Sequence, residues 1–452
     1  MASKDEKQLD KENKRLKDEL EKMRKEYEKV QKELKKVKKE FEDYKLRHPE
    51  SVGVKNKKAY VIKAKNKASI CKKPGARKGH KPHYRKMPEN IDQVKQLSVE
   101  TCPICGGASL SDNVQEERTR CIEDIPEIHP VITLYQIERR YCRDCKTIVE
   151  MPIENALPKA KIGLRAMLLV MYLKIGLRLP AESIVQLLQS VFGITISKGG
   201  VFHILGQLAG EFGSYYDDML NDLRNAPARY IDETSWRING ENVWLWAFIT
   251  KYEAVYKVAR SRSHEVPLKV LGKNHLGIDV HDRFSAYKTL AKKTGNPQQV
   301  CWSHIIANAE ELSRFRPDDG KYILEILKDI YKQAKSFDHK GTEEDIKYLY
   351  DELAYWLDIS YESNKCRKFV VNLLKEKDNL FQFVKNPNVE ATNNRAERGL
   401  RHNVIARKIS GGSRSDKGSR IYEILTSTFH TLQLRGQNLL DHGIKLIQTS
   451  SH

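Results

Sequence analysis

Apolar side chains recur in alternating steps of four and three residues over residues 5–46. The positions of this seam are Leu9, Asn13, Leu16, Leu20, Met23, Tyr27, Val30, Leu34, Val37, Phe41 and Tyr44. A seven-residue repeat sustained over about five heptads predicts a coiled coil. Asn13 replaces an apolar residue at an a position, which favours a parallel dimer with a defined register. We therefore expect a homodimer or higher oligomer through residues 5–46; the alternative is a single solvated helix.

A strand-like pattern begins near residue 225. Asn239-Gly240 separates Ser235–Ile238 from Val243–Ile249, which favours a tight primed turn. The later elements expected are strands at Ala254–Arg260, Leu276–Val280 and Gln299–Trp302, with a helix-like stretch at Ser285–Lys292. A hairpin, a third strand and then alternating helix and strand is the order of an RNase H-like mixed sheet. We expect this domain to span residues 225–430.

Helical patterns lie inside and before this domain. Residues 305–385 predict a helical insertion, with apolar side chains at three- and four-residue steps in Tyr322–Ala334 and Glu344–Trp356. Residues 158–222 predict a helical module, in which Glu182–Phe192 and Ser197–Leu208 resemble a helix–turn–helix with Ser197 as an N-cap. Lys198 would then face a DNA groove. Equally, Val201, Ile204 and Leu208 would pack into a helical bundle. Residues 431–452 are expected to form a C-terminal helix or tail.

Composition adds an anionic partner to this picture. The net charge is +20, and residues 51–88 hold 13 Lys and Arg with no Asp or Glu. A basic segment of this kind binds nucleic acid through counterion release, although it is also compatible with a solvated linker. Residues 47–90 are therefore interpreted as a basic linker. The apolar runs of the whole chain are too short for a membrane span, and the N-terminus lacks the apolar core of an export signal. We therefore expect a cytoplasmic, nucleoid-associated protein with no membrane partner.

Two Cys-x-x-Cys pairs predict a structural metal site. The pairs are Cys102 with Cys105 and Cys142 with Cys145, four of the eight cysteines in the chain. Four thiolates complete a tetrahedral Zn²⁺ site, so residues 91–155 are interpreted as a zinc ribbon. Val131–Arg139 has the pattern of a strand of this ribbon.

Three carboxylates suggest a second metal site. Asp232 would lie on the central first strand of the sheet and Asp282 at the end of its parallel neighbour. A helix that carries Glu397 could complete the cluster. Phosphodiester transfer by two divalent metals uses hard oxygen ligands that hold Mg²⁺ or Mn²⁺ about 3.5–4 Å apart. Each acid alone is typical of a protein surface, but their combination with this strand order favours an active site that binds two metal ions.

Several motifs carry a family resemblance. They are Asp232-Glu233-Thr234 followed by the hairpin residues Gly240, Trp244 and Trp246; Asp282–Tyr287; Cys301-Trp302-x-His304; Asn393–Arg401; and, upstream, Pro74–Pro82 and Cys102–Gly107. Together they resemble the DDE transposases of bacterial and archaeal insertion sequences, in particular the insertion-sequence-66 family, over roughly residues 70–430. The resemblance implies movement of a DNA element with Asp232, Asp282 and Glu397 as metal ligands. The chain departs from the family pattern at Ala76-Arg77-Lys78 and Ile306-Ala307-Asn308, which affects DNA contacts rather than the carboxylates.

Further polar residues are candidates for DNA contact. Asn394, Glu397, Arg398 and Arg401 would share one helix face, which could place Arg398 or Arg401 on a phosphate. The full set of predicted DNA-binding residues is Arg77, Lys78, His80, Lys81, Lys198, Asn394, Arg398, Arg401, Arg407 and Lys408. For Cys301 and His304, core packing with a satisfied imidazole is favoured over metal ligation.

These features predict a multidomain α/β protein that acts as a DNA transposase. Its expected partners are double-stranded DNA at the element ends and at the target, and accessory transposition proteins. Its expected cofactors are two Mg²⁺ or Mn²⁺ per active site and a structural Zn²⁺. Two alternatives remain open: an RNase H-like nuclease or resolvase that cuts without joining, and a catalytically inactive DNA-binding regulator.

Overall fold

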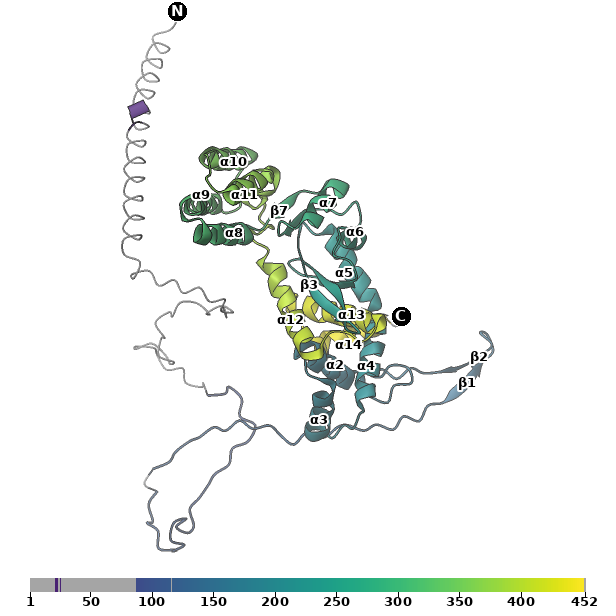
Figure 1. Cartoon of the computed structure of the whole chain (residues 1–452). Coiled ribbons are helices and arrows are strands. Elements are labelled where there is room, and N and C mark those ends of the chain that lie inside the picture. The colour runs from purple at the N-terminus through teal and green to yellow at the C-terminus, as the bar shows by residue number, and fades with distance from the viewer. Residues whose placement is uncertain (1–20, 23–24, 26–86, 115, 451–452) are drawn as a thin grey trace, which may run out of the picture. The chain divides into compact units, whose positions relative to one another are not determined.

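The computed structural model describes residues 21–22, 25, 87–114 and 116–450 (Figure 1). The chain divides into two compact units, residues 1–123 and 124–452. The predicted coiled coil lies outside the described residues except at positions 21, 22 and 25, and so do Arg77, Lys78, His80 and Lys81. None of the described helices is both long and apolar enough to cross a membrane.

A mixed five-stranded sheet forms the centre of the second unit. Its strands are β3 (Ala228–Ile238), β4 (Glu241–Ile249), β5 (Ala254–Ala259), β6 (Ile278–His281) and β7 (Gln298–Val300), in the order β5-β4-β3-β6-β7. β3 pairs antiparallel with β4 and parallel with β6, so the first strand of the sheet is also its central strand. The predicted positions of Asp232 on the central strand and of Asp282 after its parallel neighbour are confirmed.

The β3–β4 hairpin has the predicted primed turn. Asn239 and Gly240 are the two turn residues between paired Ile238 and Glu241, and both have positive φ, 50° and 88°. Asn and Gly adopt this conformation with little strain, and the turn matches the twist of the flanking strands.

Alternate residues of the strands enter two different cores, one on each face of the sheet. Tyr230, Leu245 and Ala247 belong to the core that contains the helices from α8 to α12. Ile231, Trp246 and Phe248 belong to the core that contains α2 to α5, α7 and α13. This alternation follows from the two-residue period of a strand and makes the unit a layered α/β structure.

The helices and their bounds are as follows. Before the sheet lie α2 (Leu164–Met171), η2 (Tyr172–Gly176), α3 (Ala181–Phe192), α4 (Lys198–Glu211) and α5 (Gly213–Asn225); between the strands lie α6 (Glu265–Leu271) and α7 (Ser285–Thr294). After β7 come α8 (Trp302–Phe315), α9 (Pro317–Ser336), α10 (Glu343–Leu357), α11 (Asn364–Leu374), η3 (Lys377–Asn379), η4 (Gln382–Val384), α12 (Asn394–Ser410), α13 (Asp416–Leu434) and α14 (Leu439–Ser450). Helices α8 to α11 gather to one side, and α12 leads back from them to the sheet (Figure 1). The short helix α6 was not predicted, and Trp302 begins a helix rather than ending a strand.

Helix α13 covers the free edge of strand β5 with polar side chains. Glu423, Ser427 and Thr431 accept hydrogen bonds from the backbone N–H groups of Val258, Tyr256 and Ala254, at 2.7, 2.9 and 2.9 Å. Side chains four residues apart on a helix thus meet every second residue of the strand. The edge of the sheet is satisfied and closed to further pairing.

We expect Ser427→Ala to lower the free energy of unfolding by about 1–3 kcal/mol, because the buried N–H of Tyr256 loses its acceptor. The matched control is Ser336→Ala on α9, whose hydroxyl is exposed and contacts only Gln333 O. This control should change stability by less than about 0.5 kcal/mol. Urea unfolding of both variants is the measurement; equal effects would show that the strand edge does not depend on the Ser427 hydroxyl.

The strand predicted at Val131–Arg139 is wrong. The second unit instead has a two-stranded hairpin, β1 (Arg139–Cys142) with β2 (Thr147–Glu150). Residues 131–138 have no partner strand among the described residues, and Val131, Ile132 and Leu134 are 93, 90 and 86% exposed. An apolar β-branched sequence without a pairing partner does not form a strand, because its backbone N–H groups have no acceptor.

Candidate active site

The sheet register aligns Asp232 on β3 with Asp282, which directly follows β6. The parallel pairing of β3 with β6 joins Ala228 to Ile278 and Tyr230 to Val280, a constant offset of 50 residues. Continued by two residues, this register sets Asp232 opposite Asp282. Asp282 accepts a hydrogen bond from the N–H of Phe284 at 2.9 Å, which turns the chain into α7 directly after the strand. The two aspartates therefore share one edge of the sheet.

Three hydrogen bonds fasten the start of α12 to these strands. The Asn393 side chain donates to Ile231 O at 2.8 Å, and the Asn393 backbone N–H donates to Cys301 Sγ at 3.0 Å. The Cys301 N–H in turn donates to His281 O at 2.9 Å. Ile231 precedes Asp232, His281 precedes Asp282, and Glu397 lies one helical turn after Asn393. Buried Asn393 and Cys301 thus hold together the three elements that carry the acids.

The local electrostatics show that the acids influence one another. The pKa of Asp232 is raised to about 7, chiefly by burial and also by the negative charges of Glu233, Asp282 and Glu397, against one opposing backbone hydrogen bond. A buried carboxyl among other acids is stabilised by protonation or by a bound cation. Its hard oxygen atoms suit Mg²⁺ or Mn²⁺.

This shift predicts a pH-dependent stability of the metal-free protein. The folded-state pKa of Asp232, about 7, lies above its ordinary value of 3.8, so the native state binds the proton more tightly than the unfolded state. The stabilisation is present below pH 3.8 and is lost as the pH rises through 7. We expect Asp232→Asn to raise the melting temperature of the metal-free protein at pH 8 but not at pH 4. Calorimetry with a chelator present tests this; an equal shift at both pH values would contradict it.

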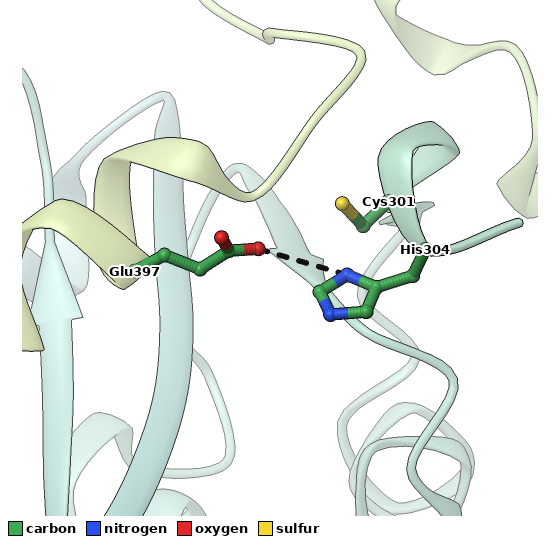
Figure 2. A group of neighbouring side chains, drawn as sticks. All are labelled: Cys301, His304 and Glu397. Carbon is green, nitrogen blue, oxygen red and sulfur yellow. Dashed lines mark ion pairs between the residues drawn. The ribbon is translucent and has the colours of Figure 1, made fainter. Parts of the chain in front are cut away.

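Glu397 lies close to Cys301 and His304. Its Oε1 is 3.7 Å from His304 Nδ1 (Figure 2). Among the described residues, these three form the one group of His, Cys, Asp or Glu whose ligand atoms all lie within 4.8 Å of one another. The two aspartates are not part of that group.

The favoured sequence interpretation of Cys301 and His304 is only half right. Cys301 is buried, as core packing requires, but the His304 side chain is 44% exposed, and no described residue forms a hydrogen bond with its Nδ1. The Cys301 sulfur raises the pKa of His304 to about 9, against a lowering by burial. Burial raises the pKa of the Cys301 thiol, but contacts with His304, Ser303 and the Asn393 N–H outweigh it and lower the pKa overall. The two side chains therefore stabilise each other's charged forms.

A buried charge network that was not predicted supports the other side of β3. Glu233 accepts hydrogen bonds from Arg262 at 2.8 Å and from the Tyr287 hydroxyl at 2.5 Å. Arg262 also stacks on the rings of Trp244 and Phe284. Glu233 and Tyr287 fall inside the sequence motifs that contain Asp232 and Asp282. Their place in these motifs was the one sequence feature that could have indicated a role beside the two aspartates. The network orients β3 and α7, which flank the two aspartates.

The predicted DNA-contact residues of α12 lie at its surface. Asn394, Arg398, Arg401 and Lys408 are exposed, and none has an ion-pair partner within the part of the chain that the structure describes. Arg407 instead donates to the backbone and side chain of Ser235 on β3. It lines a cavity of about 300 Å³ with Ser235, Trp236, Arg237, Asn242 and Gly411. Arg407 thus ties the end of α12 to the hairpin.

The helix pair α3–α4 forms as predicted, with Ser197 as the N-cap that accepts from the Gly200 N–H. Val201, Ile204 and Leu208 are buried in the core beneath the sheet, so their packing role is confirmed. Lys198 is exposed and pairs with Glu182 at 3.5 Å. One face of the helix pair packs into the core, and the opposite face, which carries Lys198, is exposed.

Both Cys-x-x-Cys pairs adopt a compact turn within their own units. Hydrogen bonds from Cys105 and Ile104 lower the pKa of Cys102, and the corresponding bonds from Cys145 and Asp144 lower the pKa of Cys142. The first turn closes through Gly106, with φ of 74°, and the second joins β1 to β2. N–H groups directed at a sulfur stabilise the thiolate, the form that binds metal.

Comparison with known families assigns the chain to a class of protein. Residues 160–421 match the family model described as "Transposase IS66 family", and residues 100–146 match the "zinc-finger binding domain of transposase IS66". The first match covers more than half of the 452 residues. The protein is thus a transposase-type protein with a zinc finger, and it belongs to the IS66 transposase family. Membership implies DNA binding, and the zinc-finger match supports a structural Zn²⁺.

Two curated proteins of Sinorhizobium fredii are similar to this chain. Uncharacterized protein y4hP is 23% identical over 78% of this chain and 71% of its own length. Uncharacterized protein y4qI is 23% identical over 81% of this chain and 73% of its own length. Their similarity extends over most of the chain, but their descriptions carry no function.

Proposed function

We propose that this protein is a DNA transposase of the DDE type, with an RNase H-like core in which Asp232, Asp282 and Glu397 bind two divalent metal ions. The observation that carries the proposal is the parallel register of β3 and β6, which sets Asp232 opposite Asp282. The hydrogen bonds of Asn393 and Cys301 bring the helix of Glu397 to the same edge. Family membership supplies the class of reaction.

In this proposal each acid has a defined task. Asp232 on β3 and Asp282 directly after β6 would hold the metal ions that position the reacting phosphodiester, and Glu397 would complete the ligand set from the first turn of α12. When bound, Mg²⁺ or Mn²⁺ activates the attacking water or 3′-hydroxyl and stabilises the leaving oxygen. The network of Glu233, Arg262 and Tyr287 keeps β3 and α7 in register during the reaction.

Double-stranded DNA binds across the basic surface near the acids. Asn394, Arg398, Arg401 and Lys408 on α12 contact phosphates, and Arg77, Lys78, His80 and Lys81 add a second basic contact. Lys198 at the start of α4 contacts DNA after exchanging its partner Glu182 for a phosphate. Residues 5–46 join two or more copies, so that both element ends are held in one complex.

Cys102, Cys105, Cys142 and Cys145 serve as the ligands of the zinc finger. Two matching turns with hydrogen-bonded sulfurs support this assignment. Cys121 lies outside the two pairs and is not among the proposed ligands.

An in vitro reaction on the DNA that flanks the gene tests the function. The full chain is incubated with labelled element ends, target DNA and Mg²⁺ or Mn²⁺. Cleavage followed by joined products supports the transposase. Cleavage without joining would instead identify a nuclease or resolvase. DNA binding without cleavage would point to an inactive regulator or to a missing accessory protein.

A further inference from the structure

Glu397 has two sets of potential partners in this structure. Its helix is fastened beside Asp232 and Asp282, yet its carboxylate is directed at His304 Nδ1, with Cys301 in the same cluster (Figure 2). The cluster combines one sulfur, one nitrogen and one oxygen ligand atom.

These donors select a different metal from the one that the aspartates select. Thiolate and imidazole are ligands for Zn²⁺ and similar borderline-soft ions, whereas Mg²⁺ prefers oxygen. In a tetrahedral zinc site, bond lengths of about 2.0–2.3 Å place neighbouring ligand atoms about 3.3–3.6 Å apart. The His304–Glu397 separation of 3.7 Å is already near that value, and all three ligand atoms lie within 4.8 Å of one another. Small side-chain movements are enough to close the site.

The cluster is also prepared for a ligand by its surroundings. Cys301 and His304 lie at the N-cap and in the first turn of α8, where a three-residue separation places them on one face. The Cys301 sulfur is oriented by the Asn393 N–H at 3.0 Å and contacts Ser303 Oγ at 2.8 Å. His304 Nδ1 is buried and has no hydrogen-bond partner within the part of the chain that the structure describes. An oriented sulfur beside an unpartnered ring nitrogen is a preorganised pair of ligands.

We propose that Cys301, His304 and Glu397 form an inhibitory Zn²⁺ site that takes Glu397 away from the catalytic carboxylates. Three protein ligands leave the fourth position for water. Since Glu397 cannot serve both sites fully, zinc at this cluster lowers the affinity for the catalytic metal. The effect on cleavage rests on the proposed function; the binding of the metal does not.

Cobalt is the probe for binding, because Co²⁺ replaces Zn²⁺ and a thiolate–cobalt bond gives a charge-transfer absorption band. The full chain first receives one equivalent of zinc per chain, which the four-thiolate finger binds more tightly than the three-ligand cluster, and it is then titrated with Co²⁺. We expect a band from about one further site per chain. The band should disappear in Cys301→Ser. In His304→Ala and Glu397→Gln the Co²⁺ affinity measured from the band should fall at least about 10-fold.

Cys366→Ser is the matched control, because Cys366 is also a buried free cysteine but lies on α11 outside the cluster. It should keep the cobalt band. His304→Ala changes a partly exposed side chain, so the test does not depend on the folding of a variant at buried Cys301. A missing band in the wild type, or a band that survives in both Cys301→Ser and His304→Ala, would overturn the site.

The second measurement is inhibition of Mg²⁺-dependent cleavage by added Zn²⁺, expressed relative to the zinc-free activity of each variant. We expect the zinc concentration for half inhibition to rise about 10-fold or more in His304→Ala and to stay unchanged in Cys366→Ser. Equal inhibition of all variants would show that zinc at this cluster does not compete with the catalytic metal for Glu397. A cobalt band in a wild-type protein that never cleaves DNA would support the metal site and contradict the proposed function, so the two failures are distinguishable.

Discussion

Replacing Asp232 by Asn is expected to reduce metal-dependent cleavage and joining by several orders of magnitude. The amide has nearly the same shape as the carboxyl, so β3 keeps its pairing with β4 and β6. It removes one negative charge from a site where burial, together with the neighbouring acids, raises the pKa of Asp232 to about 7. A neutral amide at this position binds Mg²⁺ far more weakly than a carboxylate. Gel analysis of DNA products measures the effect.

The matched control for that variant is Asp329→Asn on α9, which neutralises an exposed aspartate away from the sheet. It should retain wild-type activity. DNA binding should persist in both variants, since DNA affinity depends on basic side chains. If Asp232→Asn cleaved DNA as fast as the wild type, the proposed active site would be wrong.

Replacing Cys102 by Ser is expected to remove about one tightly bound zinc per chain. Zinc binding to structural sites contributes about 10–16 kcal/mol, so loss of one of four thiolates unfolds the finger rather than loosening it. Metal analysis of the purified protein detects the lost zinc, and a decrease in DNA affinity should accompany it.

Cys121→Ser provides the comparison, because Cys121 is an exposed cysteine outside both Cys-x-x-Cys pairs. It should retain the zinc. Zinc bound at Cys301 is separated from this measurement by introducing Cys102→Ser also in a His304→Ala background. Full zinc content in Cys102→Ser in that background would exclude Cys102 as a ligand.

Local signals in the sequence were sufficient for the framework of the sheet and the positions of two acids. Asn239-Gly240 determines its turn through backbone preferences that need no distant contact. Strand order then follows from chain order, so the placement of Asp232 and Asp282 could be predicted. The N-cap at Ser197 is equally local, since one hydroxyl satisfies one N–H in the next turn.

Features that depend on distant partners could not be predicted. Ser427 and Thr431 look like surface residues, but they are buried because strand β5 needs acceptors for its edge N–H groups. Val131–Arg139 has a strand-like pattern but no partner to pair with. The direction of the Glu397 side chain depends on His304, 93 residues earlier in the chain, which no local pattern reveals.

Because α13 follows β5 late in the chain, the edge of β5 stays uncovered during much of protein synthesis. Ala254 is synthesised 177 residues before Thr431, which satisfies its N–H group. Throughout that interval the nascent chain presents an open strand edge, the kind of surface that chaperones bind and that pairs with other nascent chains. Glu397 emerges late in the same interval. A chain still attached to the ribosome therefore lacks one of the three proposed catalytic acids for most of its synthesis.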